Sequence, residues 1–167
     1  MKHVLALTVL GLFLSLTGHV AQAQSGTNSG IYASSGTATP MQIGDAITLV
    51  KLDENGVFIE DNSGAFHNTS WHCWGTAVFN MGKGKSSGYC SGIDPTGDQV
   101  YLSFESKEYA IDAKTVDGTY KCGGGSGKYK GAVCEGTYHG FSGSLHPLTA
   151  GAYVNYSRNK GTHQFAQ

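Results

Sequence analysis

Side chains that could move protons near neutral pH recur on one face of three stretches expected to be strands. They are His72, Lys121, Glu135 and His139. If this face lines a partly desolvated cavity, it supplies acids and bases for proton transfer, with His72 and Glu135 as the catalytic pair. If it faces solvent, Lys121 and Glu135 form a cross-strand surface ion pair worth about 0 to 1 kcal/mol, and His139 is simply solvated. Strand alternation is compatible with both interpretations.

The opposite face of the same strands carries aromatic rings beside the cysteines. Trp71, Tyr120 and Tyr138 lie on it. If the polar face points outward, Tyr120 and Tyr138 become the catalytic candidates, as hydroxyl donors to a developing oxyanion. The expected substrate-binding residues are rings able to stack on an aromatic or lipophilic ligand, together with two basic side chains: Trp71, Trp74, Tyr89, Tyr101, Lys121 and His139. The plainer interpretation is that such aromatic residues are core.

These side chains must be positioned by short strands, because the chain has 25 glycines and 9 tyrosines but only 3 prolines. Eight or so strands at a spacing of about 8 to 12 residues predict a barrel or a sandwich. The segment 107–114 is expected to be a helical turn or a loop. The expected strands are a weak first strand within 24–40, then 46–52 and 57–61 about an Asn55–Gly56 turn, 69–80, 88–93, the run after Asp98, 115–122, 133–138 and 151–156.

Four cysteines allow three disulfide pairings, and the strand register selects one of them. Cys73 and Cys90 flank the turn NMGKGKSSG, just as Cys122 and Cys134 flank GGGSGKYKG. Each pair can therefore face across its own hairpin. We predict the disulfides Cys73–Cys90 and Cys122–Cys134. Thiols at paired CxxC spacing are missing from the sequence, so no metal site is expected.

The hairpin from Gly118 to Gly140 also carries a resemblance. Its turn, GGGSGKYKG, resembles the GG(T/S)GxFxG turn shared by allene oxide cyclases and dirigent proteins. The resemblance implies an all-β fold, an eight-stranded antiparallel barrel with a ligand cavity, commonly assembled as a homotrimer. It covers the glycine-rich turn and not the positions that carry the chemistry in allene oxide cyclases, so no catalytic residue is transferred from that family.

The first 23 residues have the pattern of a signal peptide. Lys2 and His3 precede an apolar run, and Ala21–Gln22–Ala23 forms an A-x-A cleavage site. The run is shorter than the roughly 20 residues of a membrane span. We therefore expect a secreted or periplasmic protein with no membrane span and a single β-barrel domain over 24–167. Without Lys2, ten Lys and Arg oppose 12 Asp and Glu, which disfavours a nucleic-acid partner.

The usual catalytic and cofactor motifs are missing from the sequence, including G-x-S-x-G, HExxH, the P-loop and the dinucleotide fingerprint. With no cofactor expected, the sequence and the resemblance predict a cofactor-independent lyase, isomerase or cyclase. Its substrate would be a small aromatic, for instance phenolic, or lipophilic molecule in the barrel. The alternative is a non-catalytic, hydrophobic-ligand-binding or dirigent-type barrel. Buried polar groups in the cavity would favour catalysis, whereas an apolar lining would favour binding or a structural role.

Overall fold

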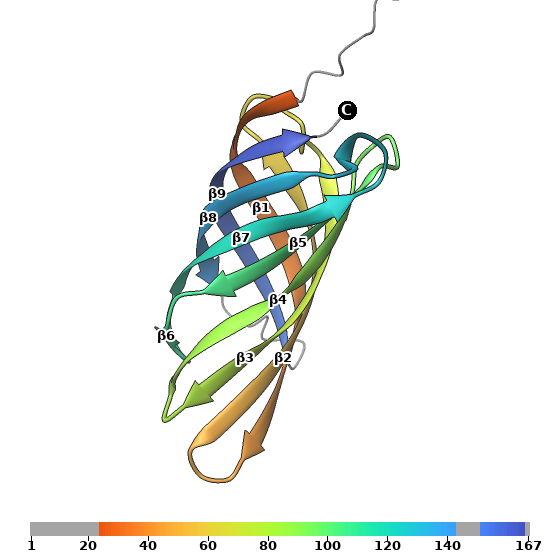
Figure 1. Ribbon diagram of the computed structural model, residues 1–167. Helices are drawn as coiled ribbons and strands as arrows, with labels where there is room; N and C mark the ends of the chain where they lie inside the picture. The colour runs from red at the N-terminus through yellow and green to blue at the C-terminus, as the bar shows by residue number, and fades with distance from the viewer. Residues whose placement is uncertain (1–23, 143–150, 166–167) are drawn as a thin grey trace, which may run out of the picture.

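A computed structural model of the protein describes residues 24–142 and 151–165, which form a closed, tilted antiparallel barrel (Figure 1). The predicted signal peptide, 1–23, lies outside the described residues. Eight long strands make the wall, and one two-residue strand lies beside it. The elements are β1 (Gln24–Ile43), β2 (Ile47–Glu60), β3 (Thr69–Asn80), β4 (Lys83–Ile93), β5 (Gln99–Ser106), β6 (Tyr109–Ala110), β7 (Thr115–Gly125), the 3₁₀ turn η1 (Gly127–Tyr129), β8 (Val133–Ser142) and β9 (Ala152–Phe165).

The wall is a simple meander, because each long strand pairs with the next one along the chain. β5 pairs directly with β7, and the short β6 pairs instead with the first two residues of β4. The ring closes where β1 pairs with β9 over 14 residue pairs. Closure leaves the long strands without an open sheet edge. The predicted eight-stranded antiparallel barrel is confirmed.

Alternation along each strand decides which side chains enter the barrel. On β3, Trp71, Cys73, Ala77 and Phe79 are buried, whereas the residues between them are more exposed. Successive side chains of a strand point to opposite faces, so one face supplies the interior and the other meets solvent. Full burial of a Phe-sized side chain contributes on the order of 1.5 to 3 kcal/mol to folding. The cysteine face is therefore the inside of the barrel.

One end of the barrel is closed by an aromatic plug, which we define as Phe66, Tyr129 and Phe165. The ring centroids lie 5.4 to 5.6 Å apart, with Phe66 stacked on Tyr129 and Phe165 edge-on to both. The Tyr129 hydroxyl donates to the carbonyl oxygen of Ala65 at 2.7 Å. The backbone N–H of Phe66 donates to the buried Glu60 carboxylate at 2.9 Å. These bonds hold the 61–68 loop over the barrel end.

The predicted hairpin about Asn55–Gly56 is wrong. β2 runs straight through both residues, because β1 pairs with it on one side and β3 on the other. Gly56 is required for close packing rather than for a turn: a Cβ there would collide with the Tyr32 ring and the Ala33 carbonyl oxygen. Pairing on both sides outweighs the local preference of Asn-Gly for a turn.

The first and last strands are also much longer than expected. β1 is a continuous strand of 20 residues, whereas a weak strand within 24–40 was expected. β9 continues to Phe165 instead of ending near Tyr156. β1 contains three glycines and β9 two asparagines, and both residue types have low strand propensity. Their mutual pairing across the closing seam supplies the missing stabilisation.

Both predicted disulfides are present. Cys73 bonds to Cys90 across β3 and β4, and Cys122 bonds to Cys134 across β7 and β8. The cysteines of the first pair are directly opposite each other in the ladder register. Both pairs lie on the inward face, so the crosslinks form part of the interior lining.

Candidate functional site

The barrel encloses a cavity of about 780 Å³. Much of its wall is apolar or aromatic. The apolar part includes Val50, Leu52, Phe58, Trp71, Leu102 and Phe104. Polar side chains also line it, around Glu54, around Asn28 and along β9, where Asn155, Ser157 and Asn159 lie. A largely apolar cavity with a few convergent polar groups is the usual form of a small-molecule site.

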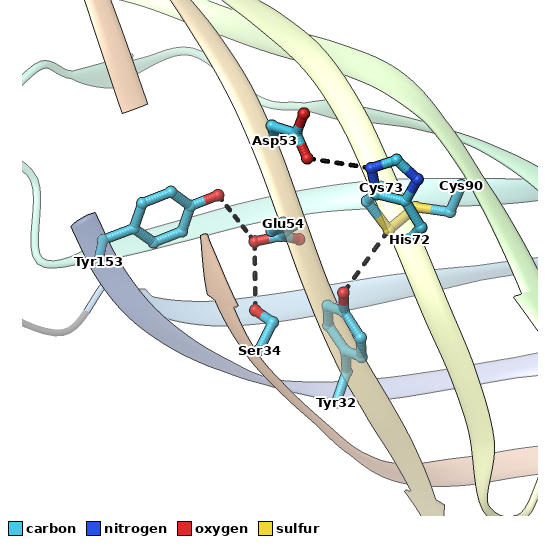
Figure 2. Close-up of a disulfide and its surroundings, with 8 residues drawn as sticks. All are labelled: Tyr32, Ser34, Asp53, Glu54, His72, Cys73, Cys90 and Tyr153. Atoms are coloured by element: carbon cyan, nitrogen blue, oxygen red, sulfur yellow. Dashed lines mark hydrogen bonds and ion pairs between the residues drawn. A yellow bond between two sulfur atoms is a disulfide. The ribbon is translucent and has the colours of Figure 1, made fainter. Parts of the chain in front are cut away.

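The first polar group is the Glu54 cluster, which we define as Glu54, Ser34, Tyr32 and Tyr153. The Tyr153 hydroxyl donates to Glu54 Oε2 at 2.9 Å, and the Ser34 hydroxyl reaches the same oxygen at 3.2 Å. Figure 2 shows both bonds converging on the carboxylate. The register explains the contact, because Gly36 lies between Glu54 of β2 and Tyr153 of β9. With no side chain on the middle strand, two long side chains can meet across it.

Burial sets the protonation behaviour of this cluster. Desolvation raises the pKa of Glu54, although hydrogen bonds from Tyr153, Ser34 and Tyr32 act in the opposite direction. Burial and then the Glu54 charge raise the pKa values of Tyr32 and Tyr153 well above the ordinary tyrosine range. Both phenols are therefore neutral hydrogen-bond donors. The Tyr32 hydroxyl is directed at Cys73 Sγ, 3.7 Å away (Figure 2).

The second polar group is the Asn28–Tyr120 pair. Asn28 Nδ2 donates to the Tyr120 hydroxyl oxygen at 2.6 Å, and the two residues come from β1 and β7. They share one row of the wall, in which Gly136 of β8 and Gly161 of β9 separate them. A Cβ on either glycine would collide with the Tyr120 hydroxyl. The phenol therefore lies flat over two glycines to reach Asn28, and burial raises its pKa.

The structure divides the sequence-predicted residues between the two faces. Trp71, Tyr120 and Tyr138 face the cavity, and burial raises the pKa of Tyr138. Trp74 and Tyr101 are each 44% exposed and Tyr89 is 62% exposed on the outer face. The other predicted site residues are also exposed outside: His72, Lys121, Glu135 and His139.

The proposed proton-transfer role of His72 and Glu135 required that their strand face line the cavity. Both residues lie on the outer face instead. His72 Nε2 lies 3.0 Å from Asp53 Oδ1 on the outer surface (Figure 2). His139 Nδ1 lies 2.8 Å from Asp117 Oδ1, also outside. Exposed pairs of this kind contribute little to stability. Lys121 and Glu135 are register partners on β7 and β8, as the surface interpretation required.

Sequence reasoning found Tyr120 and Tyr138 but missed the other polar groups of the cavity. Glu54 was placed in the expected turn, and Tyr32 and Asn28 in the weak first strand. One signal could have found Glu54, which is the alternation Val50, Leu52, Glu54 continuing to Phe58 on a single strand face. A carboxylate in an apolar row is a site candidate because burying it is costly.

Neither a metal centre nor a membrane helix is found in the described part of the chain. Among residues 24–142 and 151–165, no group of three or more His, Cys, Asp or Glu side chains could hold a metal ion. In the same ranges no helix is long and apolar enough to cross a membrane.

No protein-family model matches the chain, and no curated protein matches it either. Among solved structures, the chain is similar to the pterocarpan synthase dirigent protein GePTS1. The two share 12% sequence identity, with a TM-score of 0.48 over 97% of this chain and 99% of that chain. The family suggested by the 118–140 turn stays a prediction. The barrel that the same resemblance implied is confirmed by the strand pairing itself.

Proposed function

We propose that the protein is a binding barrel for a small, mainly apolar molecule that carries a hydroxyl group. The observation that carries this proposal is the Glu54 cluster, a hydrogen-bonded carboxyl group in a cavity of about 780 Å³ with a largely apolar wall. A volume of this size lies within the range of about 300 to 1,000 Å³ typical of small-molecule sites. The apolar wall favours an aromatic or lipophilic body for the ligand.

The Glu54 carboxylate would orient the ligand. The hydrogen bonds from Tyr153 and Ser34 both end on Oε2, so a ligand hydroxyl would donate to Oε1. A hydrogen bond to a charged group contributes about 1.5 to 3 kcal/mol, roughly tenfold or more in affinity. Tyr153 and Ser34 hold the carboxylate in place, which lowers the entropy lost when the ligand binds.

A second candidate function is proton transfer without a cofactor, and the raised pKa of Glu54 favours it. A carboxyl group whose pKa moves toward neutrality is better suited to general acid or base catalysis. Glu54 then takes the role that the sequence suggested for Glu135 and His72. Tyr153 and Tyr32 would be neutral donors to an oxygen that gains charge, in place of Tyr120 and Tyr138.

We further propose that the protein works in an oxidising compartment, secreted or periplasmic. Two disulfides in a chain of this size support this location, because cytosolic thiols are kept reduced. The predicted signal peptide supports the same location.

Fluorescence titration with hydroxystilbene, and with stilbene as its apolar match, tests the binding proposal. The protein should bind both, and Glu54→Gln should weaken hydroxystilbene binding about tenfold while leaving stilbene binding unchanged. The outward His72→Ala variant is the control and should bind both like the wild type. The proposal fails if neither probe binds saturably, or if His72→Ala weakens binding as much as Glu54→Gln does.

Product analysis separates binding from proton transfer. Under the binding proposal, hydroxystilbene and other phenolic alkenes are recovered unchanged after long incubation. An isomeric product of equal mass, formed by the wild type and lost in Glu54→Gln, would favour proton transfer instead.

A further inference from the structure

We infer that the cavity has a second anchor at Asn28 and Tyr120, so that its ligand is an elongated molecule with a hydroxyl group at each end. This inference rests on the proposed function and adds the shape and the second polar group of the ligand. It follows from three features of the described residues: an unsatisfied buried amide, its position along the barrel, and the apolar side chains between the two anchors.

The Asn28 amide is buried and incompletely hydrogen-bonded. Its residue is 5% exposed, and among the described residues its Oδ1 has no hydrogen-bond partner. Tyr120 engages just one side of the amide, so one polar atom is left over whichever way round the amide lies. An unsatisfied buried polar atom costs about 1 to 3 kcal/mol. A ligand group that formed a hydrogen bond with this atom would remove that cost.

The free positions of the pair suit a hydroxyl group. Asn28 Oδ1 can accept a hydrogen bond, and the hydroxyl hydrogen of Tyr120 is not used in its bond with Asn28. A ligand hydroxyl can donate to the first and accept from the second. A carboxylate cannot donate to Oδ1, and it would be repelled by the nearby Glu60, whose charge already acts on Tyr120.

The two anchors lie far apart on the same strand. Asn28 and Ser34 of β1 both face inward, and Ser34 belongs to the Glu54 cluster. Six residues of strand span roughly 20 Å. With a strand tilt of about 40°, this is roughly 15 Å along the barrel axis. Asn28 lies near the start of β1, toward the end of the barrel where Gln24 pairs with Phe165 of the aromatic plug.

The wall between the anchors is polar along β9, where Asn155, Ser157 and Asn159 line the cavity, and mostly apolar elsewhere. Phe58, Trp71, Phe104 and the Cys73–Cys90 disulfide line this stretch of the cavity. A ligand that reaches both anchors can therefore place an apolar middle against these side chains. Both anchors are built across glycines. Gly36 lies between Glu54 and Tyr153, and Gly136 and Gly161 lie between Tyr120 and Asn28.

Competition binding with alkanediols tests the second anchor. Linear diols with terminal hydroxyls, from octanediol to hexadecanediol, displace hydroxystilbene from the protein, and the corresponding mono-alcohols serve as matches. Diol affinity should peak near dodecanediol and exceed that of dodecanol about tenfold, because the second hydroxyl gains two hydrogen bonds. The mono-alcohols should show a steady rise with chain length and no such peak.

Two variants assign the gain to the second anchor. Asn28→Leu and Tyr120→Phe should each lower dodecanediol affinity to that of dodecanol and leave dodecanol affinity unchanged. Tyr120→Phe keeps the ring over the two glycines, so it still tests the second anchor if Asn28→Leu does not fold. Equal affinities of dodecanediol and dodecanol for the wild type would overturn the inference while the binding proposal stands. Failure of every diol and alcohol to displace the probe, together with failure of stilbene to bind, would overturn the proposed function itself.

Discussion

Asp53 and Glu54 are consecutive residues of β2 whose carboxylates lie on opposite sides of the barrel wall (Figure 2). Asp53 Oδ1 is 3.0 Å from His72 Nε2 on the outer surface, whereas Glu54 Oε2 accepts the Tyr153 hydroxyl at 2.9 Å inside. Strand alternation alone separates them. The outer carboxylate forms an exposed ion pair, and the inner one has the desolvated surroundings that a binding or catalytic site requires.

Glu54→Gln should stabilise the protein at neutral pH and have little effect in acid. The pKa of Glu54 is raised in the folded state, so between its unfolded and folded pKa values the native protein binds more protons and stability falls as pH rises. The cost is complete above the folded pKa and absent below the unfolded value near 4.5. Urea unfolding from pH 4 to pH 8 measures the difference. A variant less stable than the wild type at pH 8 would contradict the role of desolvation.

Asp94→Asn should destabilise the protein, and the effect should fade in strong acid. Burial alone would raise the pKa of Asp94, but hydrogen bonds from Lys128, Thr96 and Asp98 lower it to about 2. Lys128 Nζ lies 2.6 Å from its Oδ2. A lowered pKa stabilises the fold fully above the unfolded value near 3.8, and this contribution is lost as pH falls toward 2.

The difference in unfolding free energy between wild type and Asp94→Asn should therefore be constant above about pH 5 and shrink below pH 4. Urea unfolding at a series of pH values measures it. Asp112→Asn changes an exposed aspartate and is the matched control. A difference between wild type and Asp94→Asn that is the same at pH 2 and pH 6 would argue against the ion pair.

Tyr129→Phe should loosen the plugged end without removing the plug. The variant keeps the ring but loses the hydrogen bond to the Ala65 carbonyl, which costs about 1 kcal/mol and lowers Tm by about 3 °C. Amide exchange should become faster in the 61–68 loop that this bond holds. Tyr156→Phe, on a half-exposed outer ring, is the control and should leave both measurements unchanged. Equal effects of the two variants would show that the bond does not restrain the loop.

Removing either disulfide by paired alanine substitution should destabilise the barrel by a similar amount. The crosslinks span 17 and 12 residues, which corresponds to about 3 kcal/mol each in the chain-entropy model. Thermal unfolding of Cys73→Ala/Cys90→Ala and of Cys122→Ala/Cys134→Ala measures the cost. Peptide mapping of the unreduced wild type checks the pairing, and a Cys73–Cys134 peptide would contradict it.

Local patterns predicted much of the wall of this barrel. The β3 alternation correctly predicted the strand and the division of its residues into two faces. The cysteine spacing across two turns predicted both disulfides. They succeeded because each contact joins residues on neighbouring strands of one hairpin, where turn position fixes the register. The alternation did not tell which face is inside, because both faces of these strands carry large aromatic residues.

The polar anchors could not be predicted in the same way, because long-range pairing creates them. Tyr153 meets Glu54 from 99 residues away, and Tyr120 meets Asn28 from 92 residues away. Both contacts reach across strands that carry glycine between the two partners. The alternation on β2 marks Glu54 as an inward-facing residue, but it does not identify the partner. The Asn55–Gly56 dipeptide misled because its turn preference is local, whereas β2 is held straight by partners on both sides.

The seam between β1 and β9 has a consequence for how the protein can fold. It pairs Gln24 with Phe165, so the ring closes by joining the two ends of the described chain. Bringing together residues this far apart costs about 2 kcal/mol more than joining strands roughly 20 residues apart. A nascent chain that stops at β8 has two unpaired edges, on β1 and on β8, each able to capture a strand from another molecule. Closure of the barrel therefore has to wait for β9, and aggregation competes with folding until that strand is available.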